Sequence, residues 1–312
     1  MSAGRRSLEV PPDAAGMRVD VWLAGALEVS RARVKELLER GAVLIGGRPP
    51  RKGDRTVAGT RVEVTLESED PRPVAQPELP LSILHLDPQL VAVDKPAGMP
   101  SHPLEPGERG TVVNALVARY PECADASADP REGGLVHRLD TLTSGALLAA
   151  RTRQAWQAVR EAFTGRQVDK RYLAVVSGPV ADEGEIDLPL RHRGDHVEPA
   201  LSGGGREALT EFHVLARSGD AALLEVRIHT GVLHQIRAHL AAIGAPVLGD
   251  TAYGGRAHPG LDRFFLHAAR LGLAHPVTGL RVQISSPLPS ELRTVLGALG
   301  LAGVDWVILL GA

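Results

Sequence analysis

The segment GLVHRLDTLTSGALLAART, residues 134–152, decides how the rest of the chain is interpreted. Its second half, GALLAART, is an apolar run typical of a buried strand. Just before that strand, Asp140 follows an apolar stretch and opens a turn rich in Thr and Ser. Such a turn can present a carboxylate at the end of a strand, with hydroxyl groups nearby to orient it. Because Asp, Thr and Ser are also common turn residues, an isolated Asp140 would be interpreted as a turn cap.

Short strands and a few helices are expected to alternate around this segment. The spacing of Trp156, Val159 and Phe163 predicts a helix in RQAWQAVREAFTGR, residues 153–166. Since the expected strands outnumber the helices, we expect an α+β fold, a mixed and largely antiparallel sheet with flanking helices. The other expected elements are strands in LVAVDKPAG (90–98), KRYLAVVSG (170–178), ALTEFHVL (208–215) and ALLEVRIHTG (222–231), and a short helix in HQIRAHLAAIG (234–244).

A separate small α+β unit is expected near the N-terminus. Apolar residues recur at helical spacing from Val19 to Leu27. A second helix is expected to begin after Ser30, a favourable N-cap, and to end near Gly41, before two short strands. The expected organisation is a flexible polar tail at 1–16, the small domain at 17–66, a linker rich in Pro and acidic residues at 67–80, and a large domain at 81–312.

Positive charge is concentrated in the N-terminal unit. Through residue 64 the chain has twelve Arg or Lys and eight Asp or Glu, whereas the whole chain has a net charge of −2. A basic helix start and a basic hairpin loop could bind a phosphate backbone, but a charge run is also typical of a solvated helix face. From charge alone both interpretations stay open. The candidate RNA-binding residues here are Arg31, Arg33, Lys35, Arg51 and Lys52.

Composition excludes several classes of protein. With one cysteine, Cys123, a single chain can hold neither a disulfide nor a Cys-based zinc site, and the lone thiol suits a reducing cytoplasm. The first residues lack the apolar core of a signal peptide. The apolar segment 294–312 contains Asp305 and several glycines, so we expect a short amphipathic helix and a buried strand, WVILL, rather than a membrane span.

The N-terminal unit resembles the small RNA-binding domain first seen in a ribosomal small-subunit protein, the S-four-type domain. The similarity extends over MRVDVWLAGALEVSRARVKELLERGAVLIGGRPPRKGDRTVAGTRVEV, residues 17–64. In that family the part SRARVKELLERGAVLIGG supplies the recognition helix and the strand that follows it. The resemblance therefore favours RNA binding by the basic residues of this unit.

The larger part of the chain resembles a family of enzymes. HRLD-x-x-TSG, residues 137–145, is similar to the catalytic motif of the RluA/RluC/RluD-type pseudouridine synthases, which modify large-subunit ribosomal RNA and some tRNA. Further motifs of that family follow in the same order, and the likeness covers nearly all of 81–290. These motifs are KRYLAVVSG and HTGVLHQIRAHLAAIGAPVLGDTAYGG (229–255), with the flanking segments VAVDKPAGMPSHP (91–103) and FFLHAARLGLAHPVTG (264–279).

The resemblance implies roles for several residues. Asp140 matches the family's nucleophile, which would attack the uridine at the anomeric carbon or at the ring, two routes that both stay open. Arg237 matches the arginine that keeps this carboxylate ionised, and Tyr172 matches the tyrosine that would stack on the uracil and help to remove the proton of carbon 5. Arg138 matches an arginine that fills the space left by the flipped base. His137, beside it in the RNA-contacting motif, is expected to make a structural hydrogen bond.

Without the motif these residues would have plainer interpretations. Arg237 would be a surface helix arginine, and Tyr172 a half-buried strand tyrosine. The chain also departs from the family, because it has TGVLHQIR where many members have TGRTHQIR. Val232 and Leu233 therefore remove a positive charge and a hydroxyl, and Leu142 replaces a polar residue after the aspartate. We expect these departures to affect RNA contacts and target choice rather than activity.

No metal and no cofactor are expected. The histidines show no ligand spacing, since His234 and His239 are five residues apart, whereas the four-residue spacing of HExxH puts two ligands on one helix face. The glycine run SGGGRE, residues 202–207, lacks the GK[ST] ending of a phosphate-binding loop, and no G-x-S-x-G elbow supports a hydrolase.

The sequence therefore predicts a monomeric cytoplasmic enzyme that isomerises uridines to pseudouridine in structured RNA. Large-subunit rRNA is favoured over tRNA as the partner, because the S-four-type domain suits a large structured target. The alternative is a non-catalytic RNA-binding or ribosome-assembly factor, against which Asp140, Tyr172 and Arg237 argue together. A nucleosidase is a weaker alternative, since no second carboxylate motif is present to activate water.

Overall fold

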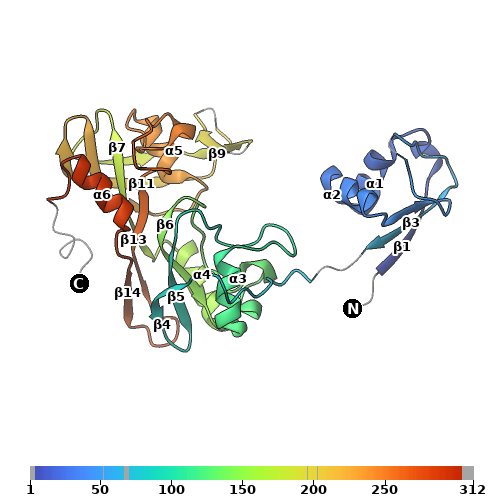
Figure 1. Cartoon of the computed structure of the whole chain (residues 1–312), viewed down its shortest axis with the longest axis horizontal. Helices are drawn as coiled ribbons and strands as arrows, with labels where there is room; N and C mark the ends of the chain where they lie inside the picture. Colours follow the sequence, from blue (N-terminus) through green and yellow to red (C-terminus); the bar gives the residue numbers. More distant parts are fainter. Residues whose placement is uncertain (1–3, 52, 67–69, 195, 202, 304–312) are drawn as a thin grey trace. The chain divides into compact units, whose positions relative to one another are not determined.

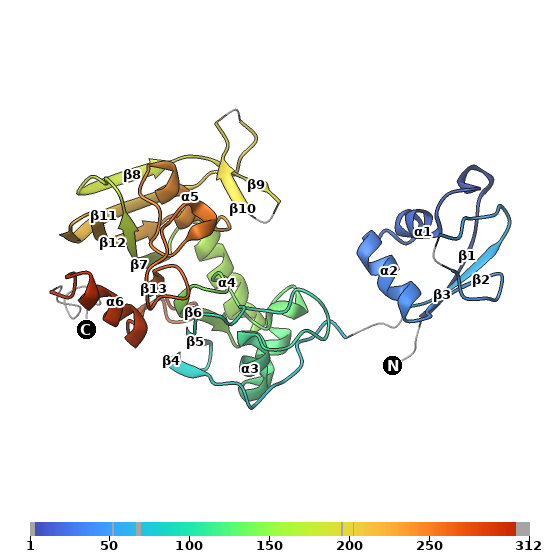
Figure 2. The same cartoon turned by 45° about the horizontal axis from the view of Figure 1, so that its top comes forward.

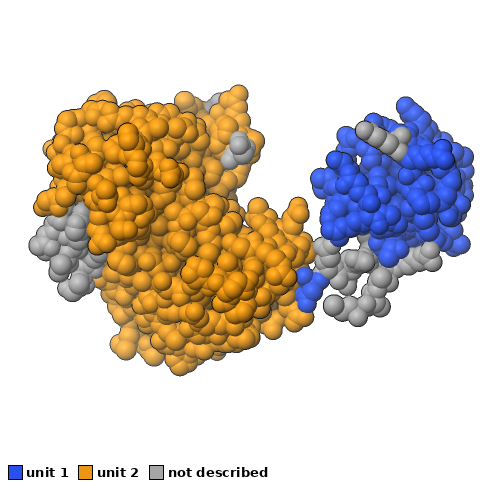
Figure 3. All heavy atoms as spheres, viewed as in Figure 1, with its two compact units in different colours: residues 1–70 blue, residues 71–312 orange. Residues whose placement is uncertain are grey.

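The computed structural model describes residues 4–51, 53–66, 70–194, 196–201 and 203–303. The chain folds into two compact units, Met1–Asp70 and Pro71–Ala312. Figure 3 shows the two units in separate colours. Their boundary lies inside the segment expected to be a linker. Each unit has its own hydrophobic core, and each is described here by itself.

The first unit packs two short helices on a small antiparallel sheet (Figure 1). The side chain of Ser30 accepts a hydrogen bond of 3.2 Å from the backbone N–H of Arg33, which caps the second helix as its sequence predicts. Trp22, Leu23 and Val34 lie in the core of the unit. The elements are α1 (Val19–Leu27), α2 (Arg31–Glu39), β1 (Gly4–Glu9), β2 (Val43–Ile45) and β3 (Arg61–Leu66), with described strands in the order β1-β3-β2.

The prediction of a flexible tail at 1–16 is wrong for the described part of that segment. Strand β1 pairs with β3, and a 3-10 helix, Pro12–Ala14, follows it. Val10 is buried in the core of the unit. The apolar alternation here consists only of Leu8 and Val10, which is too short a pattern for periodicity to distinguish a strand from a polar tail.

The second unit is built on a mixed sheet whose described strands follow the order β4-β5-β6-β13-β7-β12-β11-β8, with β14 paired to β13. The pairing of β13 with β6 is parallel, whereas the other described pairings are antiparallel, so the predicted α+β fold is confirmed. The strands are β4 (Ser82–Leu86), β5 (Leu90–Lys95), β6 (Ser144–Ala150), β7 (Asp169–Ser177), β8 (Glu183–Asp187), β11 (Leu209–Ser218), β12 (Ala221–Ile228), β13 (Leu266–Ala274) and β14 (Arg281–Ser285), and a separate hairpin is formed by β9 (Leu190–Arg193) and β10 (His196–Pro199).

Helices cover both faces of this sheet. Successive side chains of a strand point to opposite faces. On β7, Tyr172 and Ala174 belong to the core that contains α3 and α5, whereas Leu173 and Val175 belong to the core that contains α6. Along β6, alternate residues belong to the core that contains α3. The residues between them point to the other face and belong to the core that contains α4. The helices are α3 (Val112–Arg119), α4 (Arg153–Thr164), α5 (Gln235–Ala242) and α6 (Ser290–Ala298).

The structure explains why the TSG motif ends in a glycine. Gly145 lies opposite Ala268 in the parallel pairing of β6 with β13 and has a φ of +122°, a conformation that L side chains rarely adopt. A Cβ atom at this position would collide with the backbone carbonyl of Ala268 on β13. The turn that carries Asp140 can therefore approach β13 only because residue 145 has no side chain.

The C-terminal segment matches its prediction in part. An amphipathic helix is present, α6, although it begins earlier than expected, at Ser290. The strand expected at WVILL lies outside the described residues. Among the helices that the structure describes, none is both long enough and apolar enough to span a bilayer.

Candidate active site

Asp140 occupies a tightly held turn that leads into β6. On its N-terminal side, Leu139 forms a reciprocal pair with Ser101, whose hydroxyl accepts from the Leu139 N–H (3.1 Å) and donates to the Leu139 carbonyl (2.8 Å). On the other side, the Thr143 N–H donates to the Asp140 carbonyl (3.0 Å). The backbone is thus fixed, while the Asp140 side chain keeps 19% of its surface exposed.

Two buried cations hold the backbone that follows Asp140. The ammonium of Lys95 donates to the carbonyl of Thr141 (2.9 Å), which also accepts from the Gly98 N–H (2.8 Å). The guanidinium of Arg263 donates to the carbonyl of Leu142 (3.0 Å). Burial lowers the pKa of Lys95 to about 7, and the charge of Arg263 contributes. The DKPAG segment therefore stabilises the turn through the side chain of Lys95 and the backbone N–H of Gly98.

The turn opens into a cavity of about 500 Å³. Its walls come from segments that are far apart in the sequence, namely the HRLD motif, β7, α4 and the start of α5. Five residues predicted for the site line this one cavity: His137, Arg138, Asp140, Tyr172 and Arg237. The structure thus brings together every site residue that the sequence predicts in the second unit.

Arg237 lies between two carboxylates and two aromatic rings. Its Nη1 is 3.2 Å from Oδ2 of Asp140, while Asp250 accepts from both Nε (2.6 Å) and Nη2 (2.9 Å). The guanidinium carbon is 4.8 Å from the ring centre of Tyr253 and 4.2 Å from that of Phe264. Burial alone would lower the pKa of Arg237, but the hydrogen bonds and charge of Asp250, with the charge of Asp140, raise it. The guanidinium of Arg237 therefore keeps its positive charge beside Asp140.

Tyr172 stands on β7 with its side chain almost fully buried in the wall of the cavity. Burial raises the pKa of its hydroxyl far above the usual range, and the negative charge of Asp140 adds to the shift. The phenol is therefore neutral near pH 7. A neutral phenol can stack on a base and donate a hydrogen bond, but it is a weak proton acceptor.

His137 and Arg138 are neighbours with different surroundings. The Leu148 N–H donates to Nε2 of His137 (3.0 Å), and the His137 ring stacks on Phe163 with centroids 5.1 Å apart. Burial lowers the pKa of His137 to about 3, helped by Lys170, so its ring is neutral. Its described contacts are with protein groups, whereas Arg138 is exposed at the cavity.

Sequence reasoning missed three residues that shape the site, namely His234, Asp250 and Tyr253. The hydroxyl of Tyr253 accepts from the Val197 N–H (3.0 Å) and lies 3.0 Å from Nδ1 of His234, while Nε2 of His234 lies 3.8 Å from Oδ2 of Asp140. Figure 2 shows the β9–β10 hairpin, which supplies Val197, beside α5. The segment GDTAYGG belongs to the family motif at residues 229–255. No spacing in this segment indicates that Asp250 and Tyr253 face Arg237.

The two apolar departures from the family motif also contact this hairpin. Val232 is buried in a small cluster with Leu190 and Val197, and Leu233 packs against the same cluster. Both also line the cavity. The pair thus replaces polar cavity groups with apolar support for the β9–β10 hairpin.

The basic residues predicted in the N-terminal unit belong to the other compact unit, Met1–Asp70. Arg31 keeps 62% of its side chain exposed and pairs with Asp20 (2.8 Å). Arg33 and Lys35 pair with glutamates on the same helix. Arg51 is exposed, and Lys52 lies outside the described residues. Within the described ranges, no group of three or more His, Cys, Asp or Glu side chains could hold a metal ion.

Comparison with known proteins agrees with this geometry. A family model described as RNA pseudouridylate synthase matches residues 89–242. An uncharacterized RNA pseudouridine synthase of Chloroflexus aurantiacus is 41% identical over 299 residues, which are 95% of this chain and 94% of the relative. This chain belongs to the RNA pseudouridine synthase family.

Other relatives of this synthase have more specific names. Ribosomal large subunit pseudouridine synthase D of Xanthomonas campestris pv. campestris is 37% identical over 314 residues, covering 96% of this chain and 94% of that protein. The solved structure of Human RNA Pseudouridylate Synthase Domain Containing 4 matches with a TM-score of 0.56 and 27% identity, over 70% of this chain and 93% of that one. The prediction of an enzyme that converts uridine to pseudouridine in RNA is confirmed.

Proposed function

We propose that Asp140 is the nucleophile of this synthase and that Arg237 keeps its carboxylate ionised. The observation that carries the proposal is the 3.2 Å contact between Arg237 Nη1 and Asp140 Oδ2 in the wall of a cavity of about 500 Å³. At this distance the guanidinium of Arg237 can pair with the carboxylate and hold it in place for attack.

The isomerisation exchanges one bond to the ribose for another. The bond between nitrogen 1 and the anomeric carbon breaks, and the uracil turns. Carbon 5 then bonds to the anomeric carbon and loses its proton, and nitrogen 1 gains one. Asp140 would begin this sequence by attack at the anomeric carbon or at the ring, and the bond that it forms to the nucleotide would break again later in the sequence, which returns the free carboxylate. Splitting one difficult step into two is the usual gain from a carboxylate nucleophile.

Tyr172 and Arg138 would hold the flipped nucleotide and the strand that it leaves. The buried ring of Tyr172 offers a face on which the uracil stacks while it turns. The exposed guanidinium of Arg138, two residues before Asp140, would fill the gap in the RNA stack. The raised pKa of Tyr172 favours stacking and hydrogen-bond donation over proton abstraction by a phenolate.

The proposed substrate is large-subunit rRNA. Support comes from the relatives named ribosomal large subunit pseudouridine synthase D, whose alignments cover 94–96% of this chain and so include most of the first unit. In this proposal the S-four-type unit binds RNA through Arg31, Arg33, Lys35, Arg51 and Lys52. The enzyme would act as a monomer in the cytoplasm, a compartment that suits the lone buried thiol of Cys123.

The test is tritium release from unmodified large-subunit rRNA that carries tritium at uridine carbon 5. Wild type is expected to release tritium and Asp140→Asn is expected to release none. Asp125→Asn serves as the matched control, because Asp125 is exposed on a 3-10 helix and does not line the cavity. Equal release by wild type and Asp140→Asn would contradict the nucleophile. Release only from tRNA would contradict the substrate.

A further inference from the structure

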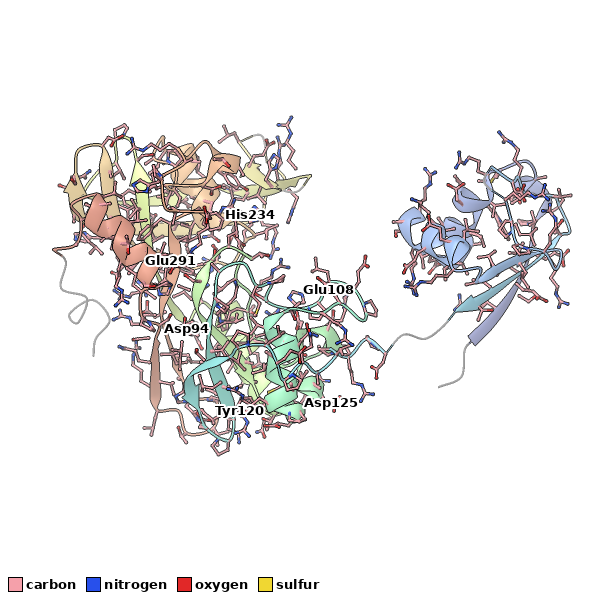
Figure 4. The ribbon with its side chains drawn as sticks, viewed as in Figure 1. Asp94, Glu108, Tyr120, Asp125, His234 and Glu291 are labelled. Atoms are coloured by element: carbon pink, nitrogen blue, oxygen red, sulfur yellow. The ribbon has the colours of Figure 1, made fainter. Side chains whose placement is uncertain are left out.

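A short chain of polar contacts reaches Asp140 from the β9–β10 hairpin. It runs from the Val197 N–H to the Tyr253 hydroxyl (3.0 Å), from that hydroxyl to Nδ1 of His234 (3.0 Å), and from Nε2 of His234 towards Asp140 Oδ2 (3.8 Å). Figure 4 labels His234 beside α5. The family resemblance gave this histidine no role, and its side chain lines the cavity.

The contacts of His234 favour Nε2 as the ring nitrogen that carries the proton. The Tyr253 oxygen already accepts from Val197, so its own proton is available to donate to Nδ1. Nε2 then carries the ring proton. The position of Asp140 leads to the same result, because a lone pair on Nε2 would repel the nearby carboxylate, whereas an N–H attracts it.

The backbone at His234 is also held in an uncommon conformation. Its φ of 53° and ψ of 19° lie in the left-handed region, where non-glycine residues are rare and are often found at functional sites. The imidazole meets the Tyr253 ring edge to face, with centroids 5.8 Å apart. Backbone conformation, ring contact and hydrogen bond together aim Nε2 at Asp140.

We propose that His234 is a positioning residue, whose Nε2–H and the guanidinium of Arg237 together hold Oδ2 of Asp140. Among the described residues, no hydrogen bond is made to the other oxygen, Oδ1, which is therefore the one left to attack. The separation of 3.8 Å is longer than a hydrogen bond, and such contacts in ligand-free sites often tighten once substrate is bound.

A neutral imidazole is sufficient for this role. Burial lowers the pKa of His234, and the charge of Arg237 adds to this, although Asp140 and Asp250 act in the opposite direction. Arg138 also lowers the pKa. His234 therefore donates through Nε2–H without first gaining a proton. The inference rests on the proposed role of Asp140 as the nucleophile.

Two substitutions separate the Nε2–H from the other contacts of His234. In His234→Asn the side chain tolerates the left-handed backbone and can still bond Tyr253, but it is too short to reach Asp140. In His234→Gln the amide nitrogen can occupy the place of Nε2. Under single-turnover conditions with tritium-labelled large-subunit rRNA, we expect tritium release to slow by about 10-fold or more in His234→Asn, because a hydrogen bond to a charged group is lost. In His234→Gln we expect it to recover to within about 3-fold of wild type, with RNA affinity unchanged in both.

The outcomes distinguish this inference from the proposed function. Wild-type rates in His234→Asn, beside an inactive Asp140→Asn, would overturn the role of His234 alone. Equal rates for wild type and Asp140→Asn would instead overturn the nucleophile. Equal slowing in His234→Asn and His234→Gln would show that the Nε2–H is not the group that matters.

A second measurement does not depend on activity. Long-range proton–nitrogen NMR of the full-length protein with ¹⁵N-labelled histidine reports which nitrogen of each ring carries the proton, and the signal lost in His234→Asn identifies His234. We expect the Nε2–H form at pH 7.5. Observation of the Nδ1–H form would overturn the proposal, whatever the rates.

Discussion

Asp250 holds the guanidinium of Arg237 with both carboxylate oxygens, at 2.6 Å and 2.9 Å. This two-point contact fixes the plane of the guanidinium and leaves Nη1 to face Asp140. The side chain of Asp250 is 1% exposed, so its charge is balanced by Arg237 rather than by water. The position of the Asp140 carboxylate thus depends on a second carboxylate, that of Asp250, which does not line the cavity.

Replacing Asp250 should therefore destabilise the second unit, Pro71–Ala312. In Asp250→Asn the buried pair loses its negative partner, and we expect the free energy of unfolding to fall by about 3 kcal/mol, the usual cost of breaking a buried ion pair. The measurement is urea denaturation of the full chain. Asp182→Asn is the control, since Asp182 pairs with Arg217 while 87% exposed, and it should change stability by less than about 1 kcal/mol. Equal midpoints for the two variants would contradict the prediction.

The ring of Tyr172 should matter more for RNA binding than its hydroxyl does. We expect Tyr172→Ala to weaken binding of unmodified rRNA by about 10-fold, because stacking on one base is worth ~1–3 kcal/mol. Tyr172→Phe keeps the ring and should bind as tightly as wild type. Filter binding at constant salt measures both. A loss in Tyr172→Phe as large as that in Tyr172→Ala would show that the hydroxyl makes the decisive contact.

Burial of Lys95 should make stability depend on pH above neutrality. The pKa of Lys95 is about 7 in the folded protein, whereas an ordinary lysine side chain has a pKa of 10.5. Between these two values the unfolded chain binds more protons, so stability rises with pH. Between pH 7 and pH 8.5 this contribution is up to about 2 kcal/mol.

Lys95→Met should lack this part of the rise. The measurement is urea denaturation of the full chain at the two pH values. Lys35→Met is the control, because Lys35 is exposed in the other unit, and its profile should follow that of wild type. Parallel profiles for Lys95→Met and wild type would show that Lys95 has an ordinary pKa.

The basic helix of the first unit should account for part of the salt dependence of RNA binding. Each phosphate contact contributes ~0.7–0.9 to the slope of log affinity against log salt. Replacing Arg31, Arg33 and Lys35 together with Gln should therefore lower the slope by about 2. Arg217→Gln, in the catalytic unit, should leave it unchanged. An unchanged slope in the triple variant would mean that these side chains only solvate the helix.

Local structure could be predicted from the sequence wherever one element carries its own signal. Ser30 and Gly41 mark both ends of α2, and the apolar run after Asp140 marks β6. Strand β1 has only one apolar side chain, that of Leu8, and its pairing partner β3 lies more than fifty residues away. A periodic pattern contains no information about such a partner, so the sequence alone predicts a tail here.

The site could be predicted only as far as the family motifs extend. They indicate Asp140, Tyr172 and Arg237 as candidate site residues, and these three side chains line one cavity. They did not indicate that Asp250 holds Arg237, or that Lys95 holds the turn after Asp140. Those contacts connect a side chain with a group on another element, which depends on how the elements pack rather than on their spacing.

The parallel pairing of β6 with β13 has a consequence for the order in which the enzyme is made. His267 on β13 lies opposite Ser144 on β6, and the Ser144 hydroxyl and the His267 ring nitrogen are 2.9 Å apart. During synthesis, Asp140 leaves the ribosome more than a hundred residues before β13 does. The turn that carries Asp140 therefore cannot reach its final structure until β13, and with it nearly the whole chain, has emerged. If Asp140 acts as proposed, a prematurely terminated chain would carry this carboxylate without its support and would not modify RNA.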